Sequence, residues 1–267
     1  MAIWSKVVGP TQLSGTTDIL IGGQPLKLPA EAKSILAIVP YVSSPAGPTA
    51  GEPIIAKVSL QSDDFPVAPY TVPCQPIGSS LGKSGIQPQE EAPKYPVNCP
   101  VKGGSELKVY ASGLIDHTVE PYVAVTVIIA DFVATPQFHA KLGTLTSTGT
   151  AATEVAGSGI RLTGCKAIKE VLGFVVGTTV AGQKGIMGKF RLSSAGFKGM
   201  GDVEFAAEPI SGVLATDATT ASAQEYAKLT RITVDVPVTD PIDINDYFTL
   251  AAALTTAGRW VVGVIYS

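Results

Sequence analysis

The stretch Ile54-Ile-Ala-Lys-Val-Ser-Leu-Gln-Ser-Asp-Asp-Phe65 returns 132 positions later as Ile186-Met-Gly-Lys-Phe-Arg-Leu-Ser-Ser-Ala-Gly-Phe197. Five of the twelve aligned positions are identical, including the lysine, the leucine and the final phenylalanine. Each copy is a short apolar run that ends in small and polar residues, which is typical of a β-strand followed by a turn. The sequence therefore predicts the same strand and turn at two places in the chain.

Three further pairs of blocks repeat in the same order around this stretch. Four pairs at nearly constant offsets indicate that one domain was duplicated. The other explanation is convergent patterning, because the strands of all β-sandwiches alternate apolar and polar residues. The offset is too long for a solenoid or a propeller, whose units span about 20–50 residues. The three pairs are Ile35–Val39 with Val171–Val175 (offset 136), Pro76–Leu81 with Pro209–Leu214 (133) and Val123–Ile129 with Trp260–Tyr266 (137).

Composition and periodicity both favour a chain made almost entirely of β-strands. The 28 glycines and 20 prolines interrupt most windows that could form a helix, whereas short β-branched runs recur throughout. A hydrophobic content of 45% with a net charge of −3 excludes a disordered chain. The predicted strands are Asp18–Ile21, Ser34–Val42, Pro53–Gln61, Val67–Val72, Glu106–Ala111, Tyr122–Ala130, Gly159–Thr163, Lys169–Thr178, Ile186–Ser193, Asp202–Ala207, Lys228–Val236, Ile242–Leu254 and Arg259–Tyr266.

The duplication predicts two tandem antiparallel β-sandwich domains, both jelly-roll-like. The expected boundaries are residues 16–133 for the first sandwich, 134–152 for a Thr/Gly/Ser-rich linker and 153–267 for the second sandwich. Residues 1–15 precede any stretch with a counterpart in the second half. We therefore expect them to form an N-terminal arm that orders by packing on a neighbouring subunit. The Pro- and charge-rich insertion Gly82–Gly104 is expected to face solvent.

The chain carries no recognisable targeting signal. Its N-terminus lacks the apolar core of a signal peptide, and no run approaches the roughly 18 apolar residues of a membrane span. We therefore expect a cytoplasmic site of synthesis and no membrane span. With a pI of about 5.4 and no Lys/Arg cluster, no specific nucleic-acid partner is expected. Cys74, Cys99 and Cys165 form no CxxC pair, which argues against zinc, and the sequence leaves open whether Cys74 and Cys99 are bridged.

Two motifs around Ser80 match catalytic or nucleotide-binding patterns only in part. Gly78-Ser-Ser-Leu-Gly82 satisfies the G-x-S-x-G pattern of a hydrolase nucleophile, but the Gly- and Pro-containing residues that follow cannot continue as the required helix. The same segment continues to Lys83-Ser84 and is one residue shorter than a phosphate-binding loop. We interpret the segment as a turn.

Acidic and imidazole side chains form no recognisable site either. Asp240, Asp243 and Asp246 offer oxygen ligands that suit Ca²⁺, but strand geometry would point them apart, so we expect turn caps and leave Ca²⁺ open. With only His117 and His139 in the chain, a metal centre made of imidazoles is not expected. The sequence thus predicts no catalytic, cofactor-binding or metal-binding residue, no cofactor and no enzymatic activity.

The size, the duplication and the strand pattern resemble those of the double jelly-roll major capsid proteins of tailless icosahedral viruses. The resemblance covers the whole chain as architecture, and no sequence motif carries functional residues over. It implies a structural protein of the virion, made in the host cytoplasm, whose homotrimers form pseudo-hexagonal capsomers because two similar domains per chain supply six corners. It also implies assembly into a higher-order shell, with minor virion proteins as further partners. A charged content of only 15% fits large subunit contacts.

The alternative function is a surface or carbohydrate-binding β-sandwich module of an extracellular protein. Aromatic side chains could line a sugar-binding face, although scattered aromatics in β-sandwiches usually belong to the core or its rim. The candidate aromatics are Tyr41, Phe65, Tyr70, Tyr95, Tyr110 and Tyr122.

Overall fold

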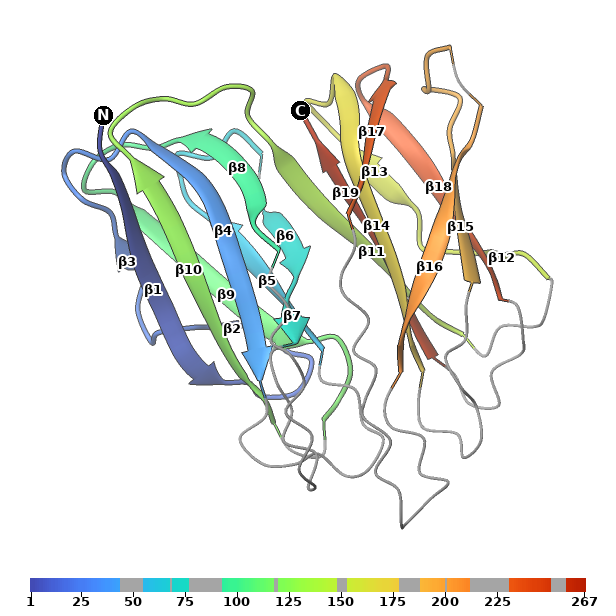
Figure 1. Ribbon diagram of the computed structural model, residues 1–267, viewed down its shortest axis with the longest axis horizontal. Helices are drawn as coiled ribbons and strands as arrows, with labels where there is room; N and C mark the ends of the chain where they lie inside the picture. The colour runs from blue at the N-terminus through green and yellow to red at the C-terminus, as the bar shows by residue number, and fades with distance from the viewer. Residues whose placement is uncertain are drawn as a thin grey trace. The chain divides into compact units, whose positions relative to one another are not determined.

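The computed structural model contains strands and no helix in the residues that it describes. These residues form two compact units: described residues up to Ala140 belong to the first, and those from Lys141 onward to the second (Figure 1). The prediction of an all-β chain with two tandem domains is confirmed. The structure describes residues 1–43, 55–67, 69–76, 93–117, 120–147, 153–177, 188–199, 201–211, 231–250 and 258–267.

The first unit is a sandwich of two sheets, and its sheet I places the first strand of the unit beside the last. β1 (Ile3–Gln12) pairs antiparallel with β10 (Tyr122–Ala130), which pairs antiparallel with β4 (Ser34–Ser43). The far edge of β4 is shared by the antiparallel β8 (Tyr95–Pro100) and the short, parallel β7 (Gln75–Pro76). This order joins strands that are far apart in sequence, as jelly rolls do.

Sheet II forms the other layer of the first unit. At its centre, β9 (Glu106–Gly113) pairs with β5 (Ala56–Gln61), which pairs with β6 (Tyr70–Pro73). On its other side, β9 pairs with two short strands, β2 (Ile19–Leu20) and β3 (Leu26–Lys27). Figure 1 shows β9 and β5 behind the strands of sheet I. Residues along β8, and along the first part of β9, are alternately buried, because one side of each strand faces the core.

The second unit repeats sheet I. β11 (His139–Ser147) neighbours β19 (Gly258–Tyr266), which pairs antiparallel with β14 (Ala167–Gly177). The far edge of β14 is again shared, by the antiparallel β17 (Ile232–Pro237) and by the parallel end of β16 (Val203–Ser211). The order β11–β19–β14 therefore matches β1–β10–β4.

Sheet II is also repeated, but one strand that is divided in the first unit is continuous in the second. β18 (Ile242–Leu250) pairs with β15 (Gly188–Ser193) and with the short strands β12 (Val155–Ala156) and β13 (Ile160–Leu162). β15 also pairs with the first part of β16, so β16 passes from sheet II to sheet I without a break. In the first unit the matching strand is divided at Cys74 into β6 and β7.

The strand pairings of the two units agree residue by residue. Lys57 lies opposite Ser112 in the first unit, and Lys189 lies opposite Thr249 in the second. The offsets are therefore 132 for β5 and β15 and 137 for β9 and β18. The offset of 132 is the one predicted from the repeated stretch, and the internal duplication is confirmed.

One predicted block is misaligned by three residues. The sequence matched Ile35–Val39 with Val171–Val175, but Ile35 corresponds to Ile168, because each pairs with the matching residue of its terminal strand. The true offset is thus 133 rather than 136. Both strands shift register directly after this residue, so both carry a β-bulge at the same place. The extra residue breaks the alternation on which the alignment depended.

The prediction of an N-terminal arm, residues 1–15, is wrong. β1 is the edge strand of sheet I, and the side chains of Val8 and Leu13 are buried. The register of β1 shifts between Val8 and Thr11, where Gly9-Pro10 interrupts the alternation. Because β1 and β11 hold the same place in their sheets, residues 1–15 do have a counterpart in the second half.

Two other segments also differ from the prediction. Residues 134–152 were assigned to a linker, but β11 lies within them and belongs to the sheet of the second unit. The end of the insertion Gly82–Gly104 was expected to face solvent, but β8 lies there and buries alternate residues. Residues 82–92 of the insertion lie outside the described residues.

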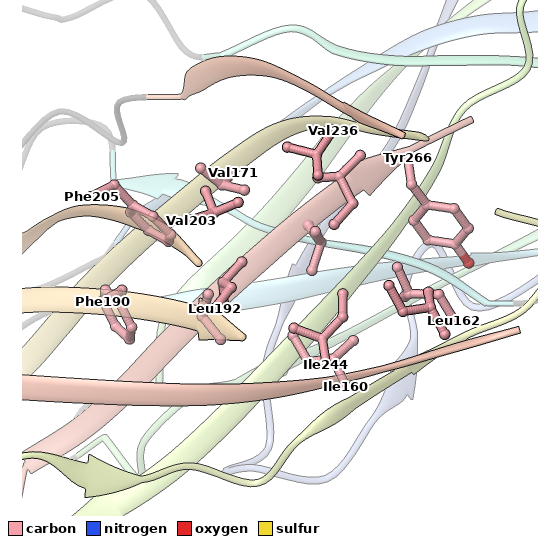
Figure 2. Close-up of a cluster of buried hydrophobic side chains, with 14 of the residues drawn as sticks. Ile160, Leu162, Val171, Phe190, Leu192, Val203, Phe205, Val236, Ile244 and Tyr266 are labelled. Atoms are coloured by element: carbon pink, nitrogen blue, oxygen red, sulfur yellow. The ribbon is translucent and has the colours of Figure 1, made fainter. Parts of the chain in front are cut away.

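The core of the second unit combines side chains from both sheets, as Figure 2 shows. Phe248 and Trp260 stack with ring centroids 3.7 Å apart, and Phe190 and Phe205 with centroids 5.5 Å apart. Aromatic pairs of this kind add about 0.5–1.5 kcal/mol beyond the burial of their surface. The cluster also contains Ile160, Leu162, Val171, Leu192, Val203, Val236, Ile244 and Tyr266.

Candidate assembly surface

The described part of the chain brings together no metal-binding set. It contains no group of three or more His, Cys, Asp or Glu side chains that could hold a metal ion. The motifs around Ser80 lie outside the described residues. His117 accepts a hydrogen bond from the backbone N–H of Ile55 at 3.3 Å, and burial lowers the pKa of His139. The same described residues include no helix long and apolar enough to cross a membrane.

The three carboxylates considered for Ca²⁺ have separate partners. Asp240 accepts a backbone N–H at 3.1 Å, Asp243 pairs with the guanidinium of Arg161 at 3.0 Å, and Asp246 accepts a backbone N–H at 2.5 Å. Together they tie residues 159–165 to β18 and to the turn before it.

The cysteines are buried free thiols. Cys99 lies opposite Ile35 on β4, whereas Cys74 directly precedes Gln75, which lies opposite Tyr41. Six residues of strand span about 20 Å, far beyond the roughly 7 Å between Cα atoms that a disulfide allows. Burial raises the pKa of Cys99 to about 12, so this thiol stays protonated near neutral pH.

The six candidate sugar-stacking aromatics do not all share one face, although Tyr41 and Tyr122 both lie on the outward side of sheet I. Phe65, Tyr70 and Tyr95 are buried, while the remaining three are half-buried. A hollow of about 400 Å³ at the outer end of sheet II in the first unit has no aromatic residue in its described lining. That lining consists of Gln61, Ser62, Asp63, Ser105, Glu106 and Lys108.

The outward face of sheet I in the first unit has a different character, since it carries no charged side chain in the described residues. Val123, Val125 and Val127 of β10 are buried, so the residues between them face outward. The strand pairings set alternate residues of β1 and β4 beside them. We call this surface the neutral face. It comprises Ile3, Ser5 and Val7 of β1, Tyr122, Ala124, Thr126 and Ile128 of β10, Ala37, Val39, Tyr41 and Ser43 of β4, and Pro96 and Asn98 of β8.

The edge of the neutral face is its most exposed part. Ile3 is 60% exposed and Val7 is 63% exposed, and both are large apolar side chains. On the neighbouring strands, Val39, Tyr41 and Ile128 are half-buried. A contiguous apolar surface of this kind on a folded domain marks an interaction site more often than a single exposed side chain does.

The matching face of the second unit differs in burial and in charge. Four of its residues on β14 and β19 are at most 2% exposed, although they turn away from the core cluster. Glu170 and Arg259, which match Ala37 and Tyr122, are half-buried and charged. The buried residues are Leu172, Phe174, Val261 and Ile265, which match Val39, Tyr41, Ala124 and Ile128.

The outward face of sheet II in the second unit is ionic by contrast. Arg191 donates two hydrogen bonds to Glu154, at 2.8 and 2.7 Å, and one to Asp202. Its guanidinium also lies 4.1 Å from the ring centroid of Tyr247. The hydrogen bonds that Arg191 donates lower the pKa of Glu154, and those that it donates to Glu154 and Asp202 raise its own pKa. The charged side chains of this surface pair with one another, as is usual on a face that is exposed to solvent.

The sequence analysis missed the neutral face because it missed β1. The signal was present in residues 3–8, where Ile3, Ser5 and Val7 alternate with Trp4, Lys6 and Val8. Lys6 and the following Gly9-Pro10 obscured the alternation.

Comparison with known proteins places the chain in no family. No protein-family model matches the sequence, and no curated protein matches it. Among solved structures, the STIV MCP aligns over 100% of this chain and 97% of its own, with 10% identity and a TM-score of 0.45. A structure of the whole Sulfolobus Turreted Icosahedral Virus contains a chain that aligns over 99% and 90%, with 12% identity and the same TM-score. A chain of infectious bursal disease virus, Gt strain, aligns over 99% and 72%, with 10% identity and a TM-score of 0.29.

The STIV major capsid protein is a double jelly-roll protein, the class that the sequence architecture resembles. With TM-scores below 0.5, these likenesses add no argument about function. The fold stated here rests on the strand pairings of the two units.

Proposed function

We propose that this protein is a viral major capsid subunit that assembles as trimeric, pseudo-hexagonal capsomers of a larger shell. The observation that carries the proposal is the residue-by-residue match between the strand pairings of the two units. A subunit of this kind is made in the host cytoplasm and resides in the virion, where minor virion proteins are further partners.

A duplicated sandwich suits a closed ring of few copies. Cyclic symmetry lets one pair of complementary surfaces close a ring of three chains. Because each chain supplies two equivalent units, the ring presents six similar corners. The whole object then packs like a hexagon, which a trimer of single sandwiches does not do.

The surface chemistry of the described residues also supports a structural role. The neutral face offers apolar contact area without charges to desolvate, and interface cores are depleted in charged residues. The carboxylates followed above hold turns or pair with arginines, as Asp240 and Glu154 do. This use of titratable groups supports a non-enzymatic function.

Light scattering coupled to size-exclusion chromatography tests the proposal directly. The full chain is expected to elute with three times the 27.5 kDa mass of one copy, and with higher multiples as its concentration rises. Negative-stain electron microscopy of the trimer fraction should show particles of hexagonal outline. A chain that remains monomeric at high concentration and binds a glycan would overturn the proposal in favour of a carbohydrate-binding module.

A further inference from the structure

We infer that the neutral face of the first unit is a docking surface for another copy of this chain. The inference rests on the proposed function, because it assigns one specific contact to the assembly proposed above. Three observations carry it: the exposure of apolar side chains, the absence of charge, and the burial of four matching residues in the second unit.

Two large apolar side chains are exposed at this face. Of the five large hydrophobic side chains that are exposed in the described residues, Ile3 and Val7 belong to it. Leaving such surface in water costs about 25 cal/mol for each Å² that a partner could cover.

The absence of charge indicates which kind of partner binds the neutral face. A face without Lys or Arg gives no attraction to nucleic acid, and one without any charge gives no pairing to an ionic protein surface. Copies of this chain each carry a net charge of −3, so contact between them is least opposed where no charge lies. The neutral face is such a place.

In the second unit, four residues at matching positions of the same sheet are buried. Phe174 and Ile265 are 1% exposed, at positions where the first unit has the half-buried Tyr41 and Ile128. The second unit has Glu170 and Arg259 where the first unit has Ala37 and Tyr122, so only the face of the first unit is free of charge on its central strands. The same arrangement of strands thus carries four buried side chains in one unit where the other has half-buried ones.

The size of the face fits a contact that contributes to assembly. The face spans five residues of β1, seven each of β10 and β4, and three of β8, and strands about 4.8 Å apart with about 3.3 Å per residue then cover roughly 350 Å². Counted on both partners this is roughly 700 Å², a part of the ~1,000 Å² expected of a specific interface. We therefore expect loss of this contact to weaken association rather than to prevent folding.

Val7→Glu tests the inference with Gln61→Glu as its matched control. Val7 is the more exposed of the two large side chains on β1, whereas Gln61 is exposed on β5, which belongs to sheet II. Each variant adds one carboxylate to an exposed strand position. We expect Val7→Glu to weaken association at least tenfold in a light-scattering concentration series. Gln61→Glu should leave association unchanged, and both variants should keep the thermal midpoint of the parent.

Thiol labelling gives a second readout that does not depend on a charge. The three native cysteines are buried, so Val7→Cys supplies a reactive thiol on the neutral face and Gln61→Cys supplies one elsewhere. Alkylation of Val7→Cys should slow at least tenfold in the assembled fraction relative to dilute protein. The rate for Gln61→Cys should stay the same.

The outcomes separate this inference from the proposed function. A parent chain that stays monomeric at all concentrations overturns both. A parent that forms trimers while Val7→Glu assembles equally well and Val7→Cys stays reactive overturns this inference alone. Protection of Val7→Cys by phosphatidylcholine vesicles, and not by protein concentration, would assign the face to a lipid surface and would also overturn it.

Discussion

The two units share one arrangement of strands but fill it with different side chains. In the middle of the second core lie three phenylalanines and a tryptophan, whereas the same positions of the first core hold three valines and an alanine. All eight residues are buried. The matched pairs are Val58 and Phe190, Val72 and Phe205, Ala111 and Phe248, and Val123 and Trp260.

The first unit has buried aromatic rings at other positions, where the second unit has smaller side chains. The first unit buries the rings of Tyr70 and Tyr95, where the second unit has Val203 and the partly exposed Ile232. The hydroxyl of Tyr70 donates a hydrogen bond to the carbonyl of Pro96, which links sheet II to sheet I. The buried aromatic rings therefore occupy different positions in the two units. The comparison teaches that alternation and register specify this fold, and that side-chain shape then decides how tightly each core packs.

Among the substitutions that test this comparison, removal of the Trp260 ring should destabilise the protein most. Trp260→Ala deletes a ring that stacks on Phe248, and such substitutions cost about 3–5 kcal/mol. The matched Val123→Ala removes two buried methyl groups at about 0.8 kcal/mol each, so its total cost should be roughly half as large. Differential scanning calorimetry measures both losses.

Fluorescence can assign the calorimetric transitions to units. Trp4 lies in the first unit and Trp260 in the second, and the chain has no other tryptophan. In Trp260→Ala the remaining emission therefore reports the first unit, whose transition should not move. Equal losses in the two variants would show that the aromatic core contributes no more than the aliphatic one.

Gly173 should show the next largest effect, because it makes room for the rings. A Cβ at this position would lie 2.6 Å from Cε2 of Phe190 and 2.7 Å from Cε2 of Phe205. The matching residue of the first unit is Pro40, which faces smaller neighbours. Gly173→Ala should destabilise the second unit by about 1–3 kcal/mol, measured by urea unfolding, because overpacked cores shift backbone and rotamers.

A double substitution sharpens this test. Adding Phe190→Val, which copies Val58 of the first unit, removes the clashing ring. The double variant should be less destabilised than the sum of the single variants by about 0.5 kcal/mol or more. Gly201→Ala is the control, since a Cβ there meets nothing within 4 Å. Additive effects of Gly173→Ala and Phe190→Val would contradict the proposed crowding.

Strands with clear β-branched runs were predictable from the sequence, and strands built around proline were not. The run Tyr122–Ala130 was predicted with its observed bounds, because alternate residues are buried along its length. β8 was missed because Pro96 and Pro100 lie within it, and Pro is ordinarily a sign of a strand edge or a turn. The Thr- and Gly-rich β11 was taken as a linker for a similar reason, although Thr favours strands.

The candidate surface depends on pairing, which the sequence does not state. That Ile3 and Val7 face outward follows only when Val8 is known to pair with Val125. Alternation alone cannot say which of the two sides of an edge strand meets the core. For the same reason the bulges at Ile35 and Ile168 became visible only in the paired strands.

Asp64 marks a smaller difference between the units, in the turn after the repeated strand. The backbone N–H of Lys102 donates to Oδ2 of Asp64 at 2.9 Å. In the second unit the matching N–H, that of Thr239, donates to the backbone carbonyl of Gly196 at 2.9 Å. One turn therefore depends on a carboxylate and the other does not.

Acidification should consequently affect the first unit alone through this turn. The hydrogen bond from Lys102 holds the pKa of Asp64 below its ordinary value of 3.8. Because the folded pKa is the lower one, the stabilisation is fully present above about pH 4 and is lost as the pH falls through the folded pKa. Asp64→Asn should lower the stability of the first unit by less than about 1 kcal/mol at pH 6, since the group is partly solvated and screened by salt. Calorimetry from pH 6 to pH 2 should show the difference between parent and variant vanish at the acid end. A difference that persists at pH 2, or that appears in the transition of the second unit, would show that the carboxylate charge is not what stabilises this turn.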